Sequence, residues 1–236
     1  MINEMLLTKY DFSNQLDISS IKKTLTEGKQ IVLIENFPED DQAYESFIVQ
    51  LGKPVLEPRN NQGKSVFDVK VHQQNNLFTS VARSNLHFPL HSDCADYKDI
   101  PNVVALLCVQ PAPERQGINT FAALQTILNK LTHTQKKQLL QKKWTFIRQK
   151  HSILNYNQEE YSICYDRITM ESFANVNDEE RDLLDSLDAI FNQCLFEVSL
   201  KKGTLALFRN DKFLHGRTSF PLDSDRVLKR IRFYLT

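Results

Sequence analysis

Residues 103–109 are Val103-Val104-Ala105-Leu106-Leu107-Cys108-Val109, an unbroken apolar run that ends shortly before Pro111. A short apolar run bounded by a proline is typical of a β-strand that is buried on both faces. A second run, Thr204 to Phe208, predicts another strand near the C-terminus, and Arg209 to Asp211 predicts the turn after it. Both runs therefore predict strands of a β core.

The segment that follows this turn predicts two more strands. Phe213 to His215 begins one of them, and turn-forming residues fill positions 221–225. Residues 226–235 then alternate, with Ile231, Phe233 and Leu235 on one face and Arg226, Leu228, Arg230, Arg232 and Tyr234 on the other. We expect two antiparallel strands joined by the turn to bring His215 and Arg226 together.

Helical patterns flank the predicted strands. The segments with helical spacing or helix-start signals are residues 19–27, 40–51, 124–131 and 177–194. Many short strands with helices outside them predict a mainly β fold with flanking helices, namely a double-stranded β-helix or jelly-roll barrel. Residues 73–85 and 149–160 are polar and weakly periodic, so they are either binding loops or lids, or disordered.

Three residues, His91, Asp93 and His215, are of the types that form an open metal site. His91 and Asp93 are two apart, so on an extended segment their side chains point the same way and can share one ion. Two imidazoles and one carboxylate are the ligand set of non-haem iron(II) oxygenases, which keeps positions open for co-substrate and dioxygen. His215 is the candidate third ligand, and the guanidinium of Arg226 can bind a carboxylate with two hydrogen bonds.

The chain resembles the iron(II)/2-oxoglutarate-dependent oxygenases of the taurine dioxygenase superfamily, and is closest in style to the clavaminate synthase branch. The resemblance covers most of the chain. It rests on Gly28 to Pro38, Leu51-Gly52-Lys53-Pro54, Leu90-His91-Ser92-Asp93, Pro111-Ala112-Pro113, Gly117-Ile118-Asn119-Thr120-Phe121, His215-Gly216-Arg217 and Asp225 to Arg230. Many members of that branch have Glu at the position of Asp93, and Gly117-Ile118 replaces a usual glycine pair.

This resemblance implies a role for each matching residue. His91, Asp93 and His215 would bind iron(II), Arg226 would bind the distal carboxylate of the co-substrate 2-oxoglutarate, and Thr120 would donate a hydroxyl to that carboxylate. Related halogenases replace the metal-binding carboxylate by a small residue, whereas this chain keeps Asp93. Hydroxylation of an aliphatic carbon is therefore favoured over halogenation, while desaturation, epoxidation and ring closure remain open.

The resemblance and the charged residues together suggest a small polar substrate of amino-acid type. The clavaminate synthase branch acts largely on amino acids and their derivatives. Four residues are candidates for binding the two charges of a zwitterion: Arg230, Arg167, Asp166 and Asn85. A surface pair is the alternative for Asp166 and Arg167.

Other kinds of site and function remain as alternatives. His87 and Cys94 lie close enough to His91 to suggest a closed zinc site, although Cys94 has the opposite parity on the strand. A cupin-type isomerase or hydrolase would use the same three ligands with another divalent metal. A non-catalytic 2-oxoglutarate-binding module would keep Arg226 without turnover.

Composition agrees with one enzyme domain spanning residues 1–236. No linker rich in Gly, Ser or Pro divides the chain, and 29 basic residues balance 29 acidic ones. A net charge of zero suggests no nucleic-acid partner, and the resemblance implies a small-molecule substrate and dioxygen instead. The N-terminal apolar run is too short for a signal peptide and no segment reaches membrane length, which predicts a cytoplasmic location.

Overall fold

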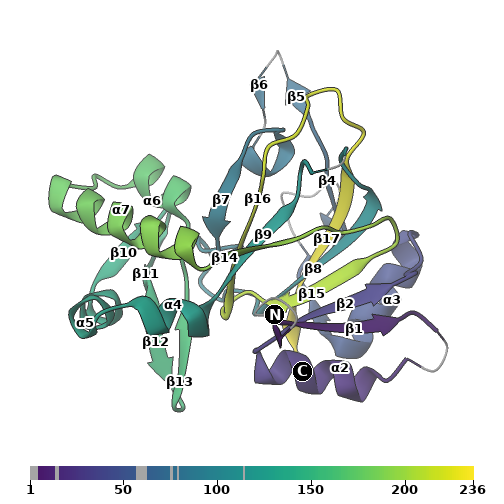
Figure 1. Ribbon diagram of the computed structural model, residues 1–236, viewed down its shortest axis with the longest axis horizontal. Helices are drawn as coiled ribbons and strands as arrows, with labels where there is room; N and C mark the ends of the chain where they lie inside the picture. The colour runs from purple at the N-terminus through teal and green to yellow at the C-terminus, as the bar shows by residue number, and fades with distance from the viewer. Residues whose placement is uncertain (1–4, 14–15, 57–62, 75–76, 79, 114) are drawn as a thin grey trace.

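The computed structural model describes the whole chain except residues 1–4, 14–15, 57–62, 75–76, 79 and 114. Two β-sheets form its centre (Figure 1). Within the described residues, the larger sheet has the strand order β1 (Leu7–Asp11), β2 (Ile31–Glu35), β15 (Leu205–Arg209), β8 (Val103–Gln110), β17 (Val227–Leu235) and β3 (Gly52–Pro54), with β4 (Phe67–Val69) also paired to β17. The smaller sheet has the order β14 (Leu195–Val198), β9 (Asn119–Ala123), β16 (Phe213–Arg217) and β7 (Phe88–His91).

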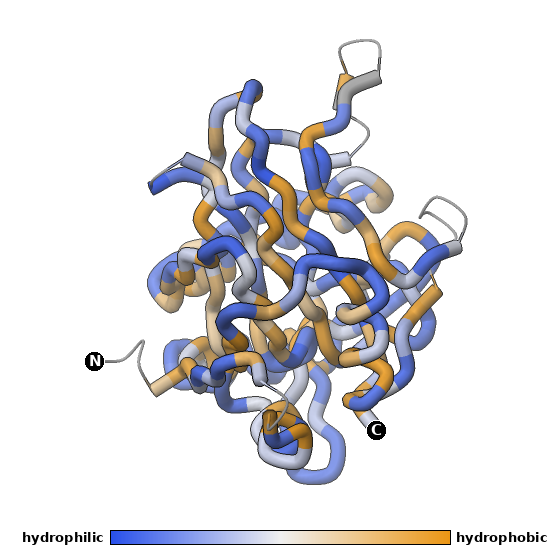
Figure 2. Tube along the Cα trace, turned by 90° about the vertical axis from the view of Figure 1, so that its right-hand side faces the viewer, coloured by the Kyte–Doolittle hydropathy of each residue, from blue (hydrophilic) through white to orange (hydrophobic). Residues whose placement is uncertain are grey.

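Strand β8 explains why the central run of the sequence is apolar throughout. Val103, Ala105 and Leu107 pack in a core on one face of the larger sheet, against helices α2 (Ile18–Glu27) and α3 (Asp41–Leu51). Val104 and Leu106 point to the other face, into a core shared with residues of the smaller sheet. Hydrophobic residues follow the strands through the interior (Figure 2). The strand is buried on both faces, as the sequence predicted.

The helices begin and end where their capping residues stand. Asp17 accepts hydrogen bonds from the first turn of α2, and Gly28 ends that helix in the left-handed region at φ 64°. Asp40 caps α3 in the same way. Both helices were predicted from the sequence.

A mostly helical segment covers the outer face of the smaller sheet (Figure 1). Its elements are α4 (Leu124–Lys130), α5 (His133–Gln141), β10 (Lys143–Phe146), β11 (Gln149–Ser152), β12 (Leu154–Asn157), β13 (Glu160–Ile163), α6 (Arg167–Phe173) and α7 (Asp178–Gln193). Residues 149–160, which the sequence left between lid and disorder, form parts of two antiparallel hairpins instead. Residues 73–85 contain the short strands β5 (Gln73–Gln74) and β6 (Leu77–Phe78) and the 3-10 turn Val81–Arg83.

One expectation about the strands was wrong. Strands β16 and β17 do not pair with each other, because β16 joins the smaller sheet and β17 the larger one. His215 and Arg226 nevertheless line one small cavity in the interior. They meet from two facing sheets, so the turn between them connects the layers of the jelly roll.

Strand β3 approaches β17 closely at Gly52. A Cβ at this position would lie 2.9 Å from the carbonyl carbon of Tyr234 and closer still to the carbonyl oxygen, so Gly52→Ala must displace backbone. We expect it to lower the free energy of unfolding by about 1–3 kcal/mol, measured by urea denaturation. Val49→Ala, on an exposed position of α3, is the matched control and should change it by less than about 0.5 kcal/mol. Equal stability of Gly52→Ala and the native protein would contradict this packing.

Candidate active site

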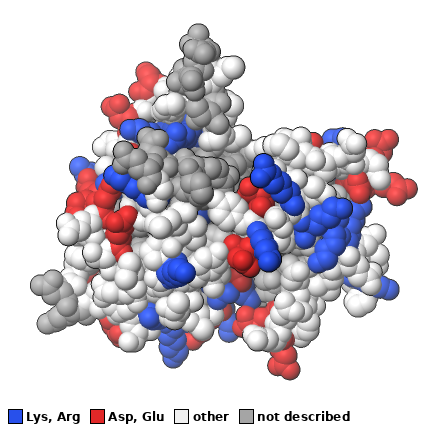
Figure 3. Space-filling model, turned by 180° about the vertical axis from the view of Figure 1, so that it is seen from behind, with Lys and Arg blue, Asp and Glu red and all other residues white. Residues whose placement is uncertain are grey.

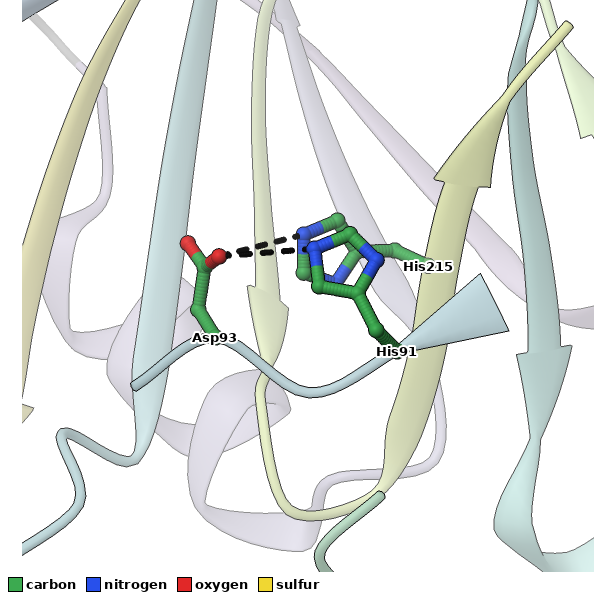
Figure 4. Close-up of side chains that lie close together, drawn as sticks. All are labelled: His91, Asp93 and His215. Carbon is green, nitrogen blue, oxygen red and sulfur yellow. Dashed lines mark ion pairs between the residues drawn. The ribbon is translucent and has the colours of Figure 1, made fainter. Parts of the chain in front are cut away.

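The side chains of His91, Asp93 and His215 lie close together and point toward one another (Figure 4). His91 Nε2 lies 3.5 Å and His215 Nε2 lies 3.9 Å from Asp93 Oδ1. The ligand atoms of the three residues all lie within 4.8 Å of one another, and all three residues are buried. This is the only such group of His, Cys, Asp and Glu residues in the described parts of the chain.

The strand register brings the two histidines together. In the pairing of β16 with β7, His215 is directly opposite His91, and their ring centroids are 4.3 Å apart. The Nδ1 atom of His91 lies 2.9 Å from the carbonyl oxygen of Pro89, which favours the tautomer with the proton on Nδ1. Its Nε2 atom is buried without a hydrogen-bond partner. A buried lone pair of this kind fits a metal ion, which would satisfy it.

Asp93 is held by its backbone as well as by its side chain. Asn210, in the turn after β15, accepts a hydrogen bond from the backbone N–H of Asp93 at 2.8 Å and donates one to its carbonyl oxygen at 2.9 Å. Asn210 also donates to the carbonyl oxygen of Pro101. One buried amide thus links the turn before β16 to the segment after β7, so the two segments that carry the candidate metal ligands share a support.

Electrostatics keeps Asp93 and His215 in the forms that bind metal. Burial raises the pKa of the Asp93 carboxyl, but Arg230 and the two histidines outweigh burial and hold the pKa well below its usual range. Burial, helped by His91, lowers the pKa of His215 to about 3. At neutral pH the site therefore presents a carboxylate and a neutral imidazole, which are the ligand forms that a divalent cation requires.

Ser92 ties the metal-binding segment to the helical region. Its backbone N–H donates to the carbonyl oxygen of Tyr165 at 2.6 Å, and its hydroxyl accepts from the N–H of Tyr165. The Tyr165 hydroxyl donates to Asp188 of α7 at 2.6 Å. Asp166 and Thr169, shortly after Tyr165, line the outer cavity, so hydrogen bonds connect this wall to the segment between His91 and Asp93.

Two cavities meet at the triad. The outer one measures about 510 Å³ and includes His91, Asp93, Asp166, Arg230 and Arg232 in its lining. The inner one, about 40 Å³, lies between the sheets and is lined in part by His91, His215, Arg226 and Arg230. His91 and Arg230 line both cavities, so the candidate metal site borders the outer cavity and the basic inner one.

Arg226 has the surroundings expected of an anion-binding residue. It is 3 % exposed, its Nη2 atom lies 3.5 Å from Asn119 Oδ1, and its guanidinium stacks over Phe220 at 5.3 Å. No carboxylate among the described residues forms an ion pair with it. Burial lowers its pKa to about 10, so it stays charged at neutral pH and can bind a carboxylate.

A glycine makes room for this guanidinium. Gly117 adopts φ +56°, and a Cβ there would lie 2.9 Å from Cδ and 3.0 Å from Nε of Arg226. The motif that carries Gly117 also carries Thr120, whose hydroxyl is buried without a hydrogen-bond partner. Asn119, rather than Thr120, is the residue of β9 whose side chain contacts Arg226. The role of Thr120 toward the co-substrate stays a prediction.

The structure separates the four candidate substrate-binding residues. Arg230 and Asp166 line the outer cavity. Asn85 is absent from its lining, and its side-chain amide donates to the carbonyl oxygen of Phe220. Arg167 forms ion pairs with Glu171, Asp185 and Asp188 on α6 and α7, which leaves it a structural role in the helical region.

The sequence patterns did not assign two further cationic residues to the site. Arg232 lies against Asp93, with Nε 2.7 Å from Oδ2, although alternation alone placed it only on the same face as Arg226 and Arg230. Arg217 is buried in the inner cavity, where it donates to the carbonyl oxygens of Ser84 and Leu86. The alternating arginines of β17 were the available signal for Arg232, but they did not show which residue they would meet.

The zinc alternative receives no support. His87 is exposed, and neither His87 nor Cys94 joins the group of ligand atoms found among the described residues. All four cysteines are free and buried. The donor set is therefore two imidazoles and one carboxylate, without a thiolate.

Comparison with known proteins agrees with this site. Residues 7–232 match the taurine catabolism dioxygenase TauD, TfdA family, and the chain belongs to that family. The match confirms the resemblance to the taurine dioxygenase superfamily and identifies the protein as an iron(II)- and 2-oxoglutarate-dependent dioxygenase. The cupin-type and non-catalytic alternatives are thereby set aside. No curated protein sequence matches the chain.

Solved structures share the jelly-roll fold. Asparagine oxygenase is 18% identical with a TM-score of 0.76, covering 93% of this chain and 77% of its own. The PvcB protein from Pseudomonas aeruginosa is 17% identical with a TM-score of 0.74, covering 97% and 86%. A putative alpha-ketoglutarate-dependent taurine dioxygenase from Burkholderia xenovorans is also 17% identical with a TM-score of 0.74, covering 98% and 87%.

Metal binding tests the triad directly. His91→Ala, Asp93→Ala and His215→Ala should each lose most bound iron(II) and all turnover, because each removes one of only three protein ligands. The measurements are metal content after anaerobic loading and succinate formation. His87→Ala, which removes an exposed histidine nearby, is the control and should bind iron as the native protein does. Full activity in any triad variant would remove that residue from the metal site.

Proposed function

We propose that this dioxygenase hydroxylates an aliphatic carbon of a small, amino-acid-like substrate bound in the outer cavity. The observation that carries this proposal is the mixed charge of the cavity wall beside the triad. Arg83 and Arg230 supply positive charge, and Asp96 and Asp166 supply negative charge. A zwitterion needs both signs within one cavity, since its ammonium pairs with a carboxylate and its carboxylate with a guanidinium.

Related structures support an amino-acid substrate. An asparagine oxygenase structure holds iron(II), 2S,3S-3-hydroxyasparagine and succinate, and it is 18% identical to this chain. The non-heme iron oxygenase OrfP, 15% identical, has been solved with (3S)-hydroxy-L-Arg. Both proteins carry hydroxylated amino acids, and both share the fold of this chain with TM-scores of 0.73.

The residues of the inner site have separate tasks in this reaction. His91, Asp93 and His215 would hold the iron, which activates dioxygen for oxidation of a C–H bond as 2-oxoglutarate is converted to succinate and carbon dioxide. Arg226, aided by Thr120, would bind the distal carboxylate of 2-oxoglutarate. The other end of the co-substrate would then lie beside His91, Asp93 and His215. This chain has a carboxylate, that of Asp93, at the ligand position where halogenases have a small residue, which favours hydroxylation over halogenation.

Surface charge supports small molecules as the partners. On the face shown in Figure 3, acidic and basic side chains are interspersed and form no extended patch of one sign. No described helix has both the length and the apolar character needed to cross a lipid bilayer. We also propose a cytoplasmic location, which the four free cysteines support because a reducing compartment keeps thiols unpaired.

The role of Arg226 in binding 2-oxoglutarate can be tested with a pair of substitutions. Arg226→Ala should raise the KM for 2-oxoglutarate at least ~10-fold, because a charged hydrogen bond in a buried site contributes about 1.5–3 kcal/mol. Gly117→Ala should act in the same direction through displacement of Arg226. Iron affinity should change much less in both variants. Leu222→Ala, at an exposed position in the turn before β17, is the control. A loss of iron with an unchanged KM would contradict the assignment.

The substrate class can be tested by a coupled screen. Free amino acids, aminoacyl thioesters and sulfonates are offered, and succinate release above the background without substrate is measured, with mass spectrometry for a gain of one oxygen. We expect coupling with amino acids, and we expect Arg230→Ala to raise the KM for the substrate more than that for 2-oxoglutarate. If only sulfonates couple, the amino-acid assignment is wrong.

A further inference from the structure

We propose that Arg232 is a positioning residue for the metal site: it holds one oxygen of Asp93 so that only the other is presented to the iron. The inference rests on the metal site described above and does not depend on the identity of the substrate. It concerns how one carboxylate ligand is kept in the orientation that an open coordination sphere requires.

The two oxygens of Asp93 have different surroundings. Oδ1 faces the two imidazoles, at 3.5 Å from His91 Nε2 and 3.9 Å from His215 Nε2. Oδ2 accepts a hydrogen bond from Arg232 Nε at 2.7 Å. A charged hydrogen bond of this length is among the stronger ones in proteins, so it defines the rotation of the carboxylate. Asn210 holds the backbone of the same residue, which leaves the side chain little freedom.

Arg230 makes a different contact with the same carboxylate. Its Nη1 atom is 3.3 Å from both oxygens, so it does not distinguish one from the other. It also stacks over Phe67 at 5.0 Å and lines both the inner and the outer cavity. Arg232 lines only the outer cavity. Arg230 can therefore give up its contact with the Asp93 carboxylate and bind an anion in either cavity. Arg232 is placed to keep its hydrogen bond to Asp93 Oδ2.

The backbone of Arg232 is as well fixed as its side chain. It pairs with Val104 in the centre of the larger sheet, and its carbonyl oxygen accepts from the N–H of Val55 at 2.8 Å. Its neighbour Phe233 is completely buried. A guanidinium carried by a central strand can fix a ligand more accurately than one carried by a loop.

The chemical consequence concerns the number of open positions on the metal. A carboxylate can bind a cation through one oxygen or two. One nitrogen from each histidine and one oxygen from Asp93 would supply three ligand atoms, which leaves the other positions of the metal for 2-oxoglutarate and dioxygen. A second oxygen from Asp93 would occupy one of those positions. By binding Oδ2, Arg232 keeps the ligand count at three.

Cobalt(II) binding by the purified, metal-free protein tests this inference without turnover. The titration gives affinity, and the visible absorption of the bound cobalt reports its coordination number. Arg232→Met should weaken cobalt binding roughly 10–100-fold and change the spectrum, as is usual when a partner of a metal ligand is removed. Arg232→Lys, which keeps the buried charge but has carbon in place of Nε, should fold like the native protein and still bind cobalt several-fold more weakly.

Matched controls separate positioning from a general effect of losing an arginine. Arg209 is also on the larger sheet and binds Asp211 through Nε and Nη2, both at 2.7 Å, so Arg209→Met removes a similar ion pair whose carboxylate is not a candidate metal ligand. It should leave cobalt affinity and spectrum unchanged. Urea denaturation of each metal-free variant shows whether a loss of binding follows a loss of folding.

The outcomes are distinguishable. Native affinity and spectrum in both Arg232 variants would overturn the positioning role while leaving the triad intact. A change in affinity that Arg209→Met reproduces would overturn it as well. If the native protein binds cobalt no better than His215→Ala does, the metal site itself is wrong, and with it the proposed function.

Discussion

The pairing of β16 with β7 is the constraint on which the active site depends. It places His215 opposite His91 at the edge of the smaller sheet, and the chain then continues from His91 into Asp93. Backbone hydrogen bonds between strands set this register, and a slip of one residue would turn His215 to the opposite face of the sheet. The geometry of the metal site is therefore a property of the sheet as much as of the three side chains.

The second feature of the interior is its concentration of buried positive charge. Arg217, Arg226, Arg230 and Arg232 are each less than 9 % exposed, and Asp93 pairs with both Arg230 and Arg232. Burying guanidinium groups without partners is unfavourable. Bound anions relieve this cost, which explains why a fold that binds a dicarboxylate tolerates such a cluster. Arg226, which lines the inner cavity, is therefore the residue expected to bind an anion, whereas Arg232 is hydrogen-bonded to Asp93.

Much of the fold follows from local sequence patterns. The apolar run at 103–109 predicted a strand buried on both faces, because only a strand between two cores requires hydrophobic residues at every position. Alternation in 226–235 predicted that Ile231 and Phe233 face one core and the arginines the other side. The spacing of His91 and Asp93, with His215 and Arg226 far along the chain, was sufficient to suggest the metal site and its anion clamp.

What the sequence determined by itself was therefore the identity of the elements and the face on which each side chain lies, since these depend on periods of two and 3.6 residues. The tertiary structure alone decided which faces meet. It put β16 and β17 in different sheets, brought Arg232 rather than solvent to Asp93, and gave Arg167 three carboxylates on neighbouring helices instead of a substrate. These contacts join residues distant in the chain, and the packing of two sheets and a helical segment selects them, which no local period encodes.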